Sequence, residues 1–171
     1  MAKNSRPPIL RSTQVRVFYR DHWLCHWCHR PTIFAPALKY LERFVDQNDY
    51  NHPVAYYHLN YRRDQAPLLD HLAAVIDHVV AYSEGGAHDE SNFVVACNKC
   101  NMRKSARNSD EFVAQYTEKP VKGSYGEPDN WDGFVALFVI LGRQNRSKLT
   151  STEKEWLQEI ENYWAADEQE I

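Results

Sequence analysis

The middle of the chain alternates short apolar runs with polar, glycine-containing turns. Leu72–Tyr82 is apolar and partly β-branched, interrupted only by one Asp-His pair, and a Gly-Gly turn follows it. Phe93–Ala96 is a second, shorter run of the same kind. Such runs predict strands, and the polar segment after Cys100 suits a helix. We therefore expect a strand, a turn, a second strand and a helix, in that order.

The flanking segments carry less specific patterns. Ser12–Arg20 suits a short helix or a strand, and residues 131–142 suit an apolar helix or a buried strand. Residues 34–45 have apolar side chains at helical spacing, but the whole stretch 31–70 is best interpreted as an insertion.

The C-terminal segment has the most complete helix signature. Thr150 and Glu153 form a capping box, in which each side chain satisfies a backbone N–H of the other residue. The helix that follows repeats apolar residues at every fourth position, namely Trp156, Ile160 and Trp164. This spacing places them on one face, which predicts core packing.

The length of 171 residues suits one domain with its own core. No stretch reaches the roughly 20 apolar residues of a membrane span. The first residues carry cations but no apolar signal segment, so we expect a cytoplasmic protein with no membrane partner. The composition changes beyond Asp110. We expect a main domain at residues 1–110, with a basic N-terminal segment and the insertion at about 31–70, and a helical extension at 111–171 packed on it.

Charge is distributed unevenly along the chain. The formal net charge is −3, yet Met1–Arg20 holds five cations and no anion, and Cys97–Arg107 holds four cations and no anion. The tail Glu153–Ile171 holds seven acids and a single cation. Local basic surface matters more for phosphate binding than net charge does. The two basic runs are compatible with nucleic acid, although such a run is more often a solvated face.

The four cysteines form two C-x-x-C pairs, Cys25 with Cys28 and Cys97 with Cys100. A redox dithiol would explain one pair only, and a disulfide framework is not expected in a chain without an export signal. Four thiolates around one Zn²⁺ use every cysteine and satisfy the tetrahedral preference of structural zinc. We therefore predict a structural zinc with no open position for substrate. A mixed site would take one ligand from His22, His26 or His29 instead.

Further polar residues lie between the cysteine pairs or directly after them. They are Asp77, His78, Asn92, Asn101 and Lys104. Each is a weak signal alone, but with the cysteines their spacing resembles the HNH endonuclease family, the zinc-bound branch of the ββα-metal (His-Me finger) nucleases. The matching segments are Cys25-x-x-Cys28, Asp77-His78-Val79-Val80, Gly85-Gly86, Ser91-Asn92 and Cys97-x-x-Cys100-Asn101-x-x-Lys104.

One position departs from the family's name, which implies a final histidine where this chain has Asn101. The HNH domain of the RNA-guided CRISPR nucleases is similar here, since it also has asparagine at this position and is active. The resemblance implies an α+β fold with a ββα-metal core and additional helices. It also implies a metal-dependent endonuclease that hydrolyses phosphodiester bonds in DNA.

The chemistry of the residues agrees with such an activity. A neutral imidazole can take a proton from water near neutral pH, so His78 is the candidate general base. Asp77 and the side-chain oxygen of Asn101 are hard ligands suited to Mg²⁺ or Mn²⁺. By resemblance, Asn92 is expected to brace the turn that orients His78. Lys104 is expected to contact the phosphate beside the cut.

Other polar and aromatic residues are interpreted as structural. Asp70-His71 is a second Asp-His pair, without a glycine-rich turn at the right distance. His88 is expected to be an exposed loop histidine, although it could approach DNA or a metal. Four aromatic side chains could stack on bases, but core packing is favoured for Trp23, Trp27, Tyr56 and Tyr57.

Functions other than cleavage stay open at this point. A zinc-stabilised nucleic-acid-binding module without cleavage activity would explain the cysteines and the basic runs, but not the spacing of Asp77, His78 and Asn101. The acidic C-terminal helix could serve protein interaction. One site of this kind cuts one strand, so a clean double-strand cut would imply a dimer or two encounters.

Overall fold

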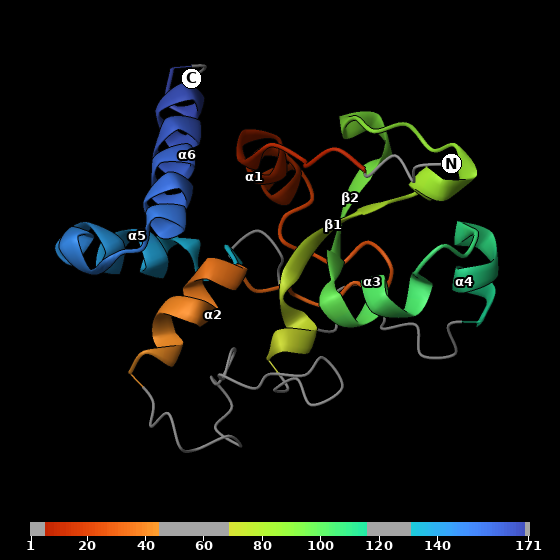
Figure 1. Cartoon of the computed structure of the whole chain (residues 1–171), viewed down its shortest axis with the longest axis horizontal. Helices are drawn as coiled ribbons and strands as arrows, with labels where there is room; N and C mark the ends of the chain where they lie inside the picture. The colour runs from red at the N-terminus through yellow and green to blue at the C-terminus, as the bar shows by residue number, and fades with distance from the viewer. Residues whose placement is uncertain (1–5, 45–68, 116–130, 170–171) are drawn as a thin grey trace.

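The computed structural model describes residues 6–44, 69–115 and 131–169 (Figure 1). Apart from short 3₁₀ helices, this part of the chain forms six α-helices and two β-strands. They are α1 (Arg11–Arg20), α2 (Ala35–Glu42), β1 (Ala74–His78), β2 (Phe93–Cys97), α3 (Asn98–Lys104), α4 (Ser109–Gln115), α5 (Val135–Gln144) and α6 (Ser151–Asp167). The described fold is therefore mixed helix and strand, in agreement with the predicted α+β class.

The centre of the molecule is the antiparallel hairpin of β1 and β2. Its register pairs Ala74 with Cys97 at one end and His78 with Phe93 at the other. Helix α3 begins at the residue after β2, so the predicted order of strand, strand and helix is confirmed. Figure 1 shows the hairpin between α1 and the C-terminal helices on one side and α3 and α4 on the other.

Strand β2 is buried on both faces, and its alternating side chains belong to two different cores. Phe93 and Val95 pack into the larger core with α1, α5 and α6. Val94 and Ala96 pack into a smaller core with the cysteines. Successive side chains of a strand point to opposite faces, so this one short strand joins the two cores.

The C-terminal helices complete the larger core. Helix α6 packs along α1, and α5 packs against α2. The predicted capping box is present, because Glu153 N donates to Thr150 Oγ1 at 3.2 Å and Thr150 N donates to Glu153 Oε2 at 2.8 Å. Ile160 is buried and the two tryptophans of the stripe pack against the core, which confirms that the stripe serves packing.

Two ambiguous segments are helical. Residues 11–20 and residues 135–144 both form α-helices rather than strands. Phe34 and the buried side of α2 lie in the larger core, so the first part of the predicted insertion is built into the domain. The remainder of that insertion lies outside the described residues. None of the described helices is both long and apolar enough to cross a membrane.

Candidate functional site

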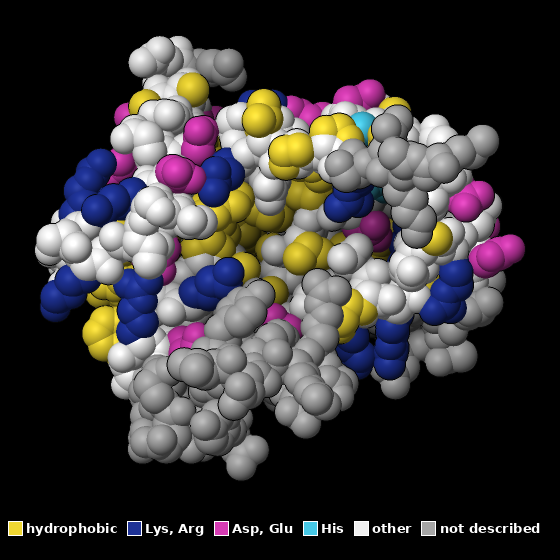
Figure 2. All heavy atoms as spheres, viewed as in Figure 1, with side chains coloured by type: hydrophobic (Ala, Val, Ile, Leu, Met, Phe, Trp, Pro, Cys, Tyr) yellow, Lys and Arg dark blue, Asp and Glu magenta, His cyan; other side chains and the backbone are white. Residues whose placement is uncertain are grey.

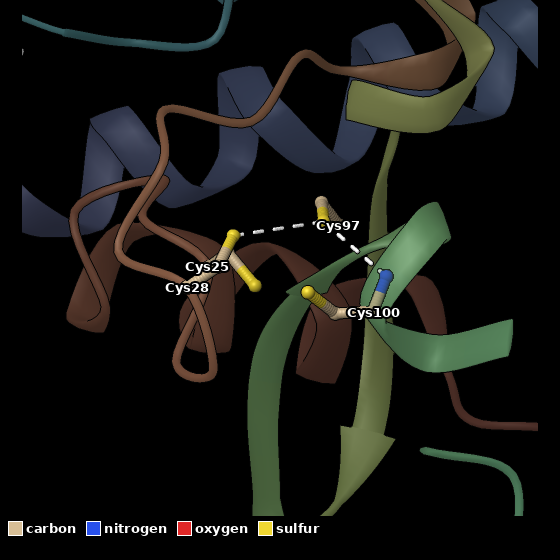
Figure 3. Close-up of side chains that lie close together, drawn as sticks. All are labelled: Cys25, Cys28, Cys97 and Cys100. Carbon is tan, nitrogen blue, oxygen red and sulfur yellow. Dashed lines mark hydrogen bonds between the residues drawn. The ribbon is translucent and has the colours of Figure 1, made fainter. Parts of the chain in front are cut away.

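The four cysteines converge on one point of the smaller core. Cys25 and Cys28 come from the loop after α1, Cys97 ends β2, and Cys100 lies in the first turn of α3 (Figure 3). Their four Sγ atoms all lie within 4.8 Å of one another, and all four residues are buried. Tetrahedral zinc with Zn–S bonds of about 2.3 Å requires sulfurs about 3.8 Å apart. The Sγ atoms of Cys28 and Cys97 are 3.9 Å apart, so the cluster fits such a cation.

Backbone hydrogen bonds hold the first pair of cysteines against the hairpin. His26 N donates to Val95 O at 2.8 Å, and Cys25 N donates to Arg30 O at 2.9 Å. Within the described residues, these four cysteines are the only group of three or more His, Cys, Asp or Glu side chains close enough to share a metal. The alternative site with a histidine ligand is therefore not supported.

The sulfurs also perturb one another's protonation. Hydrogen bonds with Cys100, Cys28 and Cys97, together with burial, raise the pKa of the Cys25 thiol. Hydrogen bonds with Cys100, Cys25 and Cys97 lower the pKa of Cys28, against the effect of its burial. The four thiols thus lie close enough to affect one another's pKa, and binding of a soft cation would require them to lose their protons.

A second site opens beside α3. It is a cavity of about 540 Å³ at the end of β1, and it brings together three of the predicted residues, Asp77, His78 and Asn101. The rest of its lining is Arg6, Ala81, Tyr82, Ser83, Met102, Ser105 and Ala106. Of these two sites, the cysteine cluster is buried and the cavity is open, so the cavity is the one that can receive a substrate.

The Asp77 carboxylate is held from two sides. Its Oδ1 accepts a hydrogen bond from His78 N at 2.8 Å, and its Oδ2 accepts one from Trp27 Nε1 at 2.9 Å. Burial raises the pKa of Asp77, although the charge of Lys104 and the two hydrogen bonds act in the opposite direction. Each carboxylate oxygen still has a lone pair available, so the group fits a hard cation.

His78 is the last residue of β1 and is only 2% exposed. Burial, followed by the charge of Arg6, lowers the pKa of His78 to about 4, and the neighbouring His88 and Lys104 act in the same direction. The imidazole is therefore neutral at pH 7. Its Nε2 lies 3.2 Å from Nδ1 of His88, whereas its own Nδ1 makes no hydrogen bond to the described residues. That nitrogen is available to accept a proton.

Lys104 does not occupy the position that the sequence suggested. Its side chain is completely buried, and Nζ donates to the carbonyl oxygen of His78 at 2.8 Å. The same Nζ lies 3.7 Å from Asp77 Oδ2 and 5.2 Å from the ring centre of Trp27. The expected phosphate contact does not fit this burial. Lys104 instead fixes the backbone of the candidate base and compensates the charge of Asp77.

Asn92 joins the two sides of the glycine-rich turn. Its Nδ2 donates to Val80 O and to Ala87 O, and its Oδ1 accepts from Val80 N, each at 2.9 Å. A Cβ at Gly86 would lie 1.9 Å from Val80 O, so only glycine fits at this close approach. Asn92 thus makes the bracing bonds expected of it, without lining the cavity.

Three residues near the site were not assigned to it from the sequence. His88 was expected to be an exposed loop residue, but its ring stacks on His78. Trp27 was expected to pack in the core; it is 7% exposed, and it also donates to Asp77. Arg6 belongs to the N-terminal basic run, yet it lines the cavity. Only His88 had a local sequence signal, because it lies two residues after Gly86 of the glycine-rich turn.

The residues interpreted as structural lie away from the cavity. Asp70 is 3% exposed, and its Oδ2 accepts a hydrogen bond from Asn98 Nδ2 at 2.9 Å. Trp23 is 2% exposed, so neither it nor Trp27 presents a free ring for stacking on a base. The other two aromatic candidates, Tyr56 and Tyr57, lie outside the described residues.

In the comparison with protein families, residues 66–107 match the family model for HNH endonuclease. The matched segment contains Asp77, His78, Asn92 and Asn101 together with the second cysteine pair. The resemblance inferred from the sequence is therefore confirmed over this part of the chain. Comparison with curated proteins and with solved structures gave no match.

Proposed function

We propose that this chain is a metal-dependent DNA endonuclease whose active site is the cavity between β1 and α3. One observation carries the proposal: Asp77, His78 and Asn101 line a single open cavity within the segment that matches the HNH endonuclease model. A nucleic-acid-binding module without cleavage would have no need of a neutral base and two oxygen ligands beside each other.

His78 is the proposed general base. With a pKa lowered to about 4 by burial and nearby cations, the imidazole is free to accept a proton from the attacking water at pH 7. A bound phosphate would bring negative charge into the cavity and raise this pKa toward the value at which histidine is the more effective base. Lys104 holds the carbonyl group of this residue, and Asn92 holds the backbone of Val80, two residues further on.

Asp77 and Asn101 are the proposed ligands of the catalytic cation, Mg²⁺ or Mn²⁺. A carboxylate and an amide oxygen are the donors such cations prefer, and the remaining positions are usually filled by water or phosphate. When bound, a divalent cation neutralises charge that develops on the phosphate and on the leaving oxygen. The hydrogen bond from Trp27 fixes the direction of the Asp77 carboxylate.

Arg6 is the proposed contact to the substrate phosphate, in the role first assigned to Lys104. Among the cations of the described N-terminal run, three have acidic partners: Arg11 pairs with Glu155 at 2.8 Å, Arg16 with Glu90, and Arg20 with Asp21 at 2.7 Å. Arg6 lines the cavity, and its side chain has no such partner among the described residues. It is thus available to bind an anion there.

The surface around the cavity also suits DNA. Lys99, Arg103 and Arg107 lie on or just after α3, and Figure 2 shows Lys and Arg side chains beside this helix. A basic surface next to the site favours association with the phosphate backbone. The four cysteines are proposed to hold a structural Zn²⁺ that fixes the start of α3.

Incubation of supercoiled plasmid with the purified chain tests the proposed activity. We expect nicked circles with Mg²⁺ or Mn²⁺, no product with EDTA, and no product with the His78→Ala variant. His71→Ala is the matched control, because it removes a histidine from the other Asp-His pair, and it should cut at the wild-type rate. Binding of DNA without cleavage under all conditions would favour the nucleic-acid-binding module instead.

A further inference from the structure

We propose that His88 is a positioning residue for His78. It accepts a hydrogen bond from Nε2–H of His78 and so selects the tautomer whose Nδ1 is free to take the proton from water. This inference rests on the proposed function, in which His78 is the general base, but its structural part can be tested without any cleavage.

The contact between the two rings is close and well supported. Nε2 of His78 and Nδ1 of His88 are 3.2 Å apart, and the ring planes differ by 24° with centroids 5.3 Å apart. Phe93 packs edge-on against both rings, with its centroid 4.9 Å from His78 and 5.3 Å from His88. Tyr82 adds a further contact to His88 at 5.5 Å. His88 is thus half-buried in an aromatic pocket rather than free in a loop.

The backbone that carries His88 is fixed by the same residue that fixes the end of β1. Asn92 Nδ2 donates both to Val80 O and to Ala87 O, the residue just before His88. On the other side, Asp89 Oδ1 accepts from Ser91 N at 3.0 Å. The two imidazoles are therefore held against each other by hydrogen bonds on both flanks of the turn.

Only one proton can lie between the two facing nitrogens when both rings are neutral. If His88 donated it, His78 would carry its own proton on Nδ1, and that nitrogen could not accept another from water. If His78 donates it, Nδ1 of His78 is bare, and this atom has no other partner among the described residues. The proposed role of His78 as the base therefore assigns His88 as the acceptor.

The proton balance of the reaction is simple in this arrangement. The attacking water gives one proton to Nδ1 of His78 as its oxygen bonds to phosphorus, and the phosphorus–oxygen bond to the leaving strand breaks. The leaving oxygen takes a proton from solvent, and His78 later returns its proton to solvent. The hydrogen bond to His88 stabilises the imidazolium that exists between these steps.

Long-range ¹H–¹⁵N spectra of the histidine rings in the full chain test the hydrogen bond directly. We expect His78 to carry its proton on Nε2, and His88 to have a bare Nδ1. In the His88→Ala variant the His78 ring should relax toward the tautomer mixture of a free histidine. A proton on Nδ1 of His88, or an unchanged His78 ring in the variant, would overturn the proposal whether or not the protein cuts DNA.

Cleavage kinetics test the consequence. His88→Ala should lower kcat by about tenfold or more with KM unchanged, since partners that orient a reacting ligand typically contribute 10–100-fold. His88→Gln keeps an acceptor and should recover part of that loss, while His71→Ala should change neither constant. If the wild type cuts and His88→Ala retains full kcat, the role of His88 is wrong but the proposed function stands. Failure of the wild type to cut would instead contradict the proposed function.

Discussion

The cysteine cluster and the cavity are built from the same short stretch of chain, yet they are opposite kinds of site. Cys97 and Cys100 lie at the junction of β2 and α3, and Asn101 is the next residue. The sulfurs are 0–1% exposed, whereas the cavity beside Asn101 has a volume of about 540 Å³. Four thiolates around one metal leave no coordination position for a substrate, whereas an open set of oxygen and nitrogen groups leaves such a position. The cysteine that belongs to the cluster and the asparagine that lines the cavity are thus adjacent residues of α3.

The two regions are nevertheless connected by hydrogen bonds. Trp27, between the first two cysteines in sequence, donates a hydrogen bond to Asp77. Lys104, at the end of α3, donates to the carbonyl of His78. Because a structural metal contributes far more to folding than one side chain does, loss of the cluster should also disrupt the cavity, whereas a single substitution in the cavity should leave the cluster intact. The predictions below test this asymmetry.

The largest effect is expected from Cys100→Ser, which removes one sulfur from the cluster. Binding of structural zinc supplies on the order of 10 kcal/mol to the folding of small zinc domains. We expect the variant to lose zinc, to unfold at much lower temperature and to lose all cleavage. Thermal unfolding followed by circular dichroism measures the change in melting temperature, and metal analysis measures the loss of zinc. A variant that melts with the wild type would show that the cluster does not hold the fold.

The two Asp-His pairs provide a matched test of the cavity. Asp77→Asn removes a charged ligand at nearly constant shape, and we expect cleavage to fall about 10²–10³-fold, the range found when one charge-stabilising group is removed. Asp70→Asn should cut normally but lose about 1 kcal/mol of unfolding free energy, because its buried carboxylate lies outside the cavity and accepts a hydrogen bond from Asn98. Initial cleavage rates and urea unfolding compare the two. Equal rates would remove the distinction between the pairs.

Much of this architecture follows from local pattern. The apolar run of β2, the two C-x-x-C pairs and the capping box each depend on residues a few positions apart, and the hairpin, the cluster and α6 form accordingly. Lysine is almost never fully buried unless it is paired. The burial of Lys104 depends on Asp77 and Trp27, which are far from it in sequence, so no local pattern could indicate it.

The same reason explains the residues that were not assigned to the site. Arg6 reaches the cavity only because α1 packs on the hairpin, and a basic run does not show which of its members will find acidic partners. His88 approaches His78 through a turn whose shape depends on Gly86 and Asn92. The motif identified the reacting groups, whereas tertiary packing selected the groups that assist them.

A smaller effect is expected from removing the proposed phosphate contact. Arg6→Gln should weaken DNA binding and kcat/KM by about tenfold and reduce the slope of log K against log salt by about one. Arg11→Gln is the control, since Arg11 pairs with Glu155 on α6. Fluorescence anisotropy with labelled DNA over a range of salt measures both variants. Equal losses would mean that the basic segment acts only through its overall charge.

The smallest effect concerns an ion pair remote from both regions. Burial would raise the pKa of Glu153, but hydrogen bonds from Arg43 and Thr150 outweigh it and lower the pKa. A lowered folded pKa contributes stability above the unfolded value, and that stability is lost as pH falls through the folded pKa. Glu153→Gln should therefore lower the unfolding free energy by about 0.5–1 kcal/mol at pH 7. Urea unfolding at several pH values should show the difference vanish in acid, with cleavage at pH 7 unchanged.

The most direct test of two separable sites is the Asn101→Ala variant, analysed for metal and for cleavage in the same preparation. Asn101 lines the cavity and directly follows a cysteine of the cluster. We expect about one zinc per chain, as in the wild type, and no cleavage of plasmid with Mg²⁺ or Mn²⁺. Loss of zinc together with cleavage, or cleavage at the wild-type rate, would contradict the separation of the two sites.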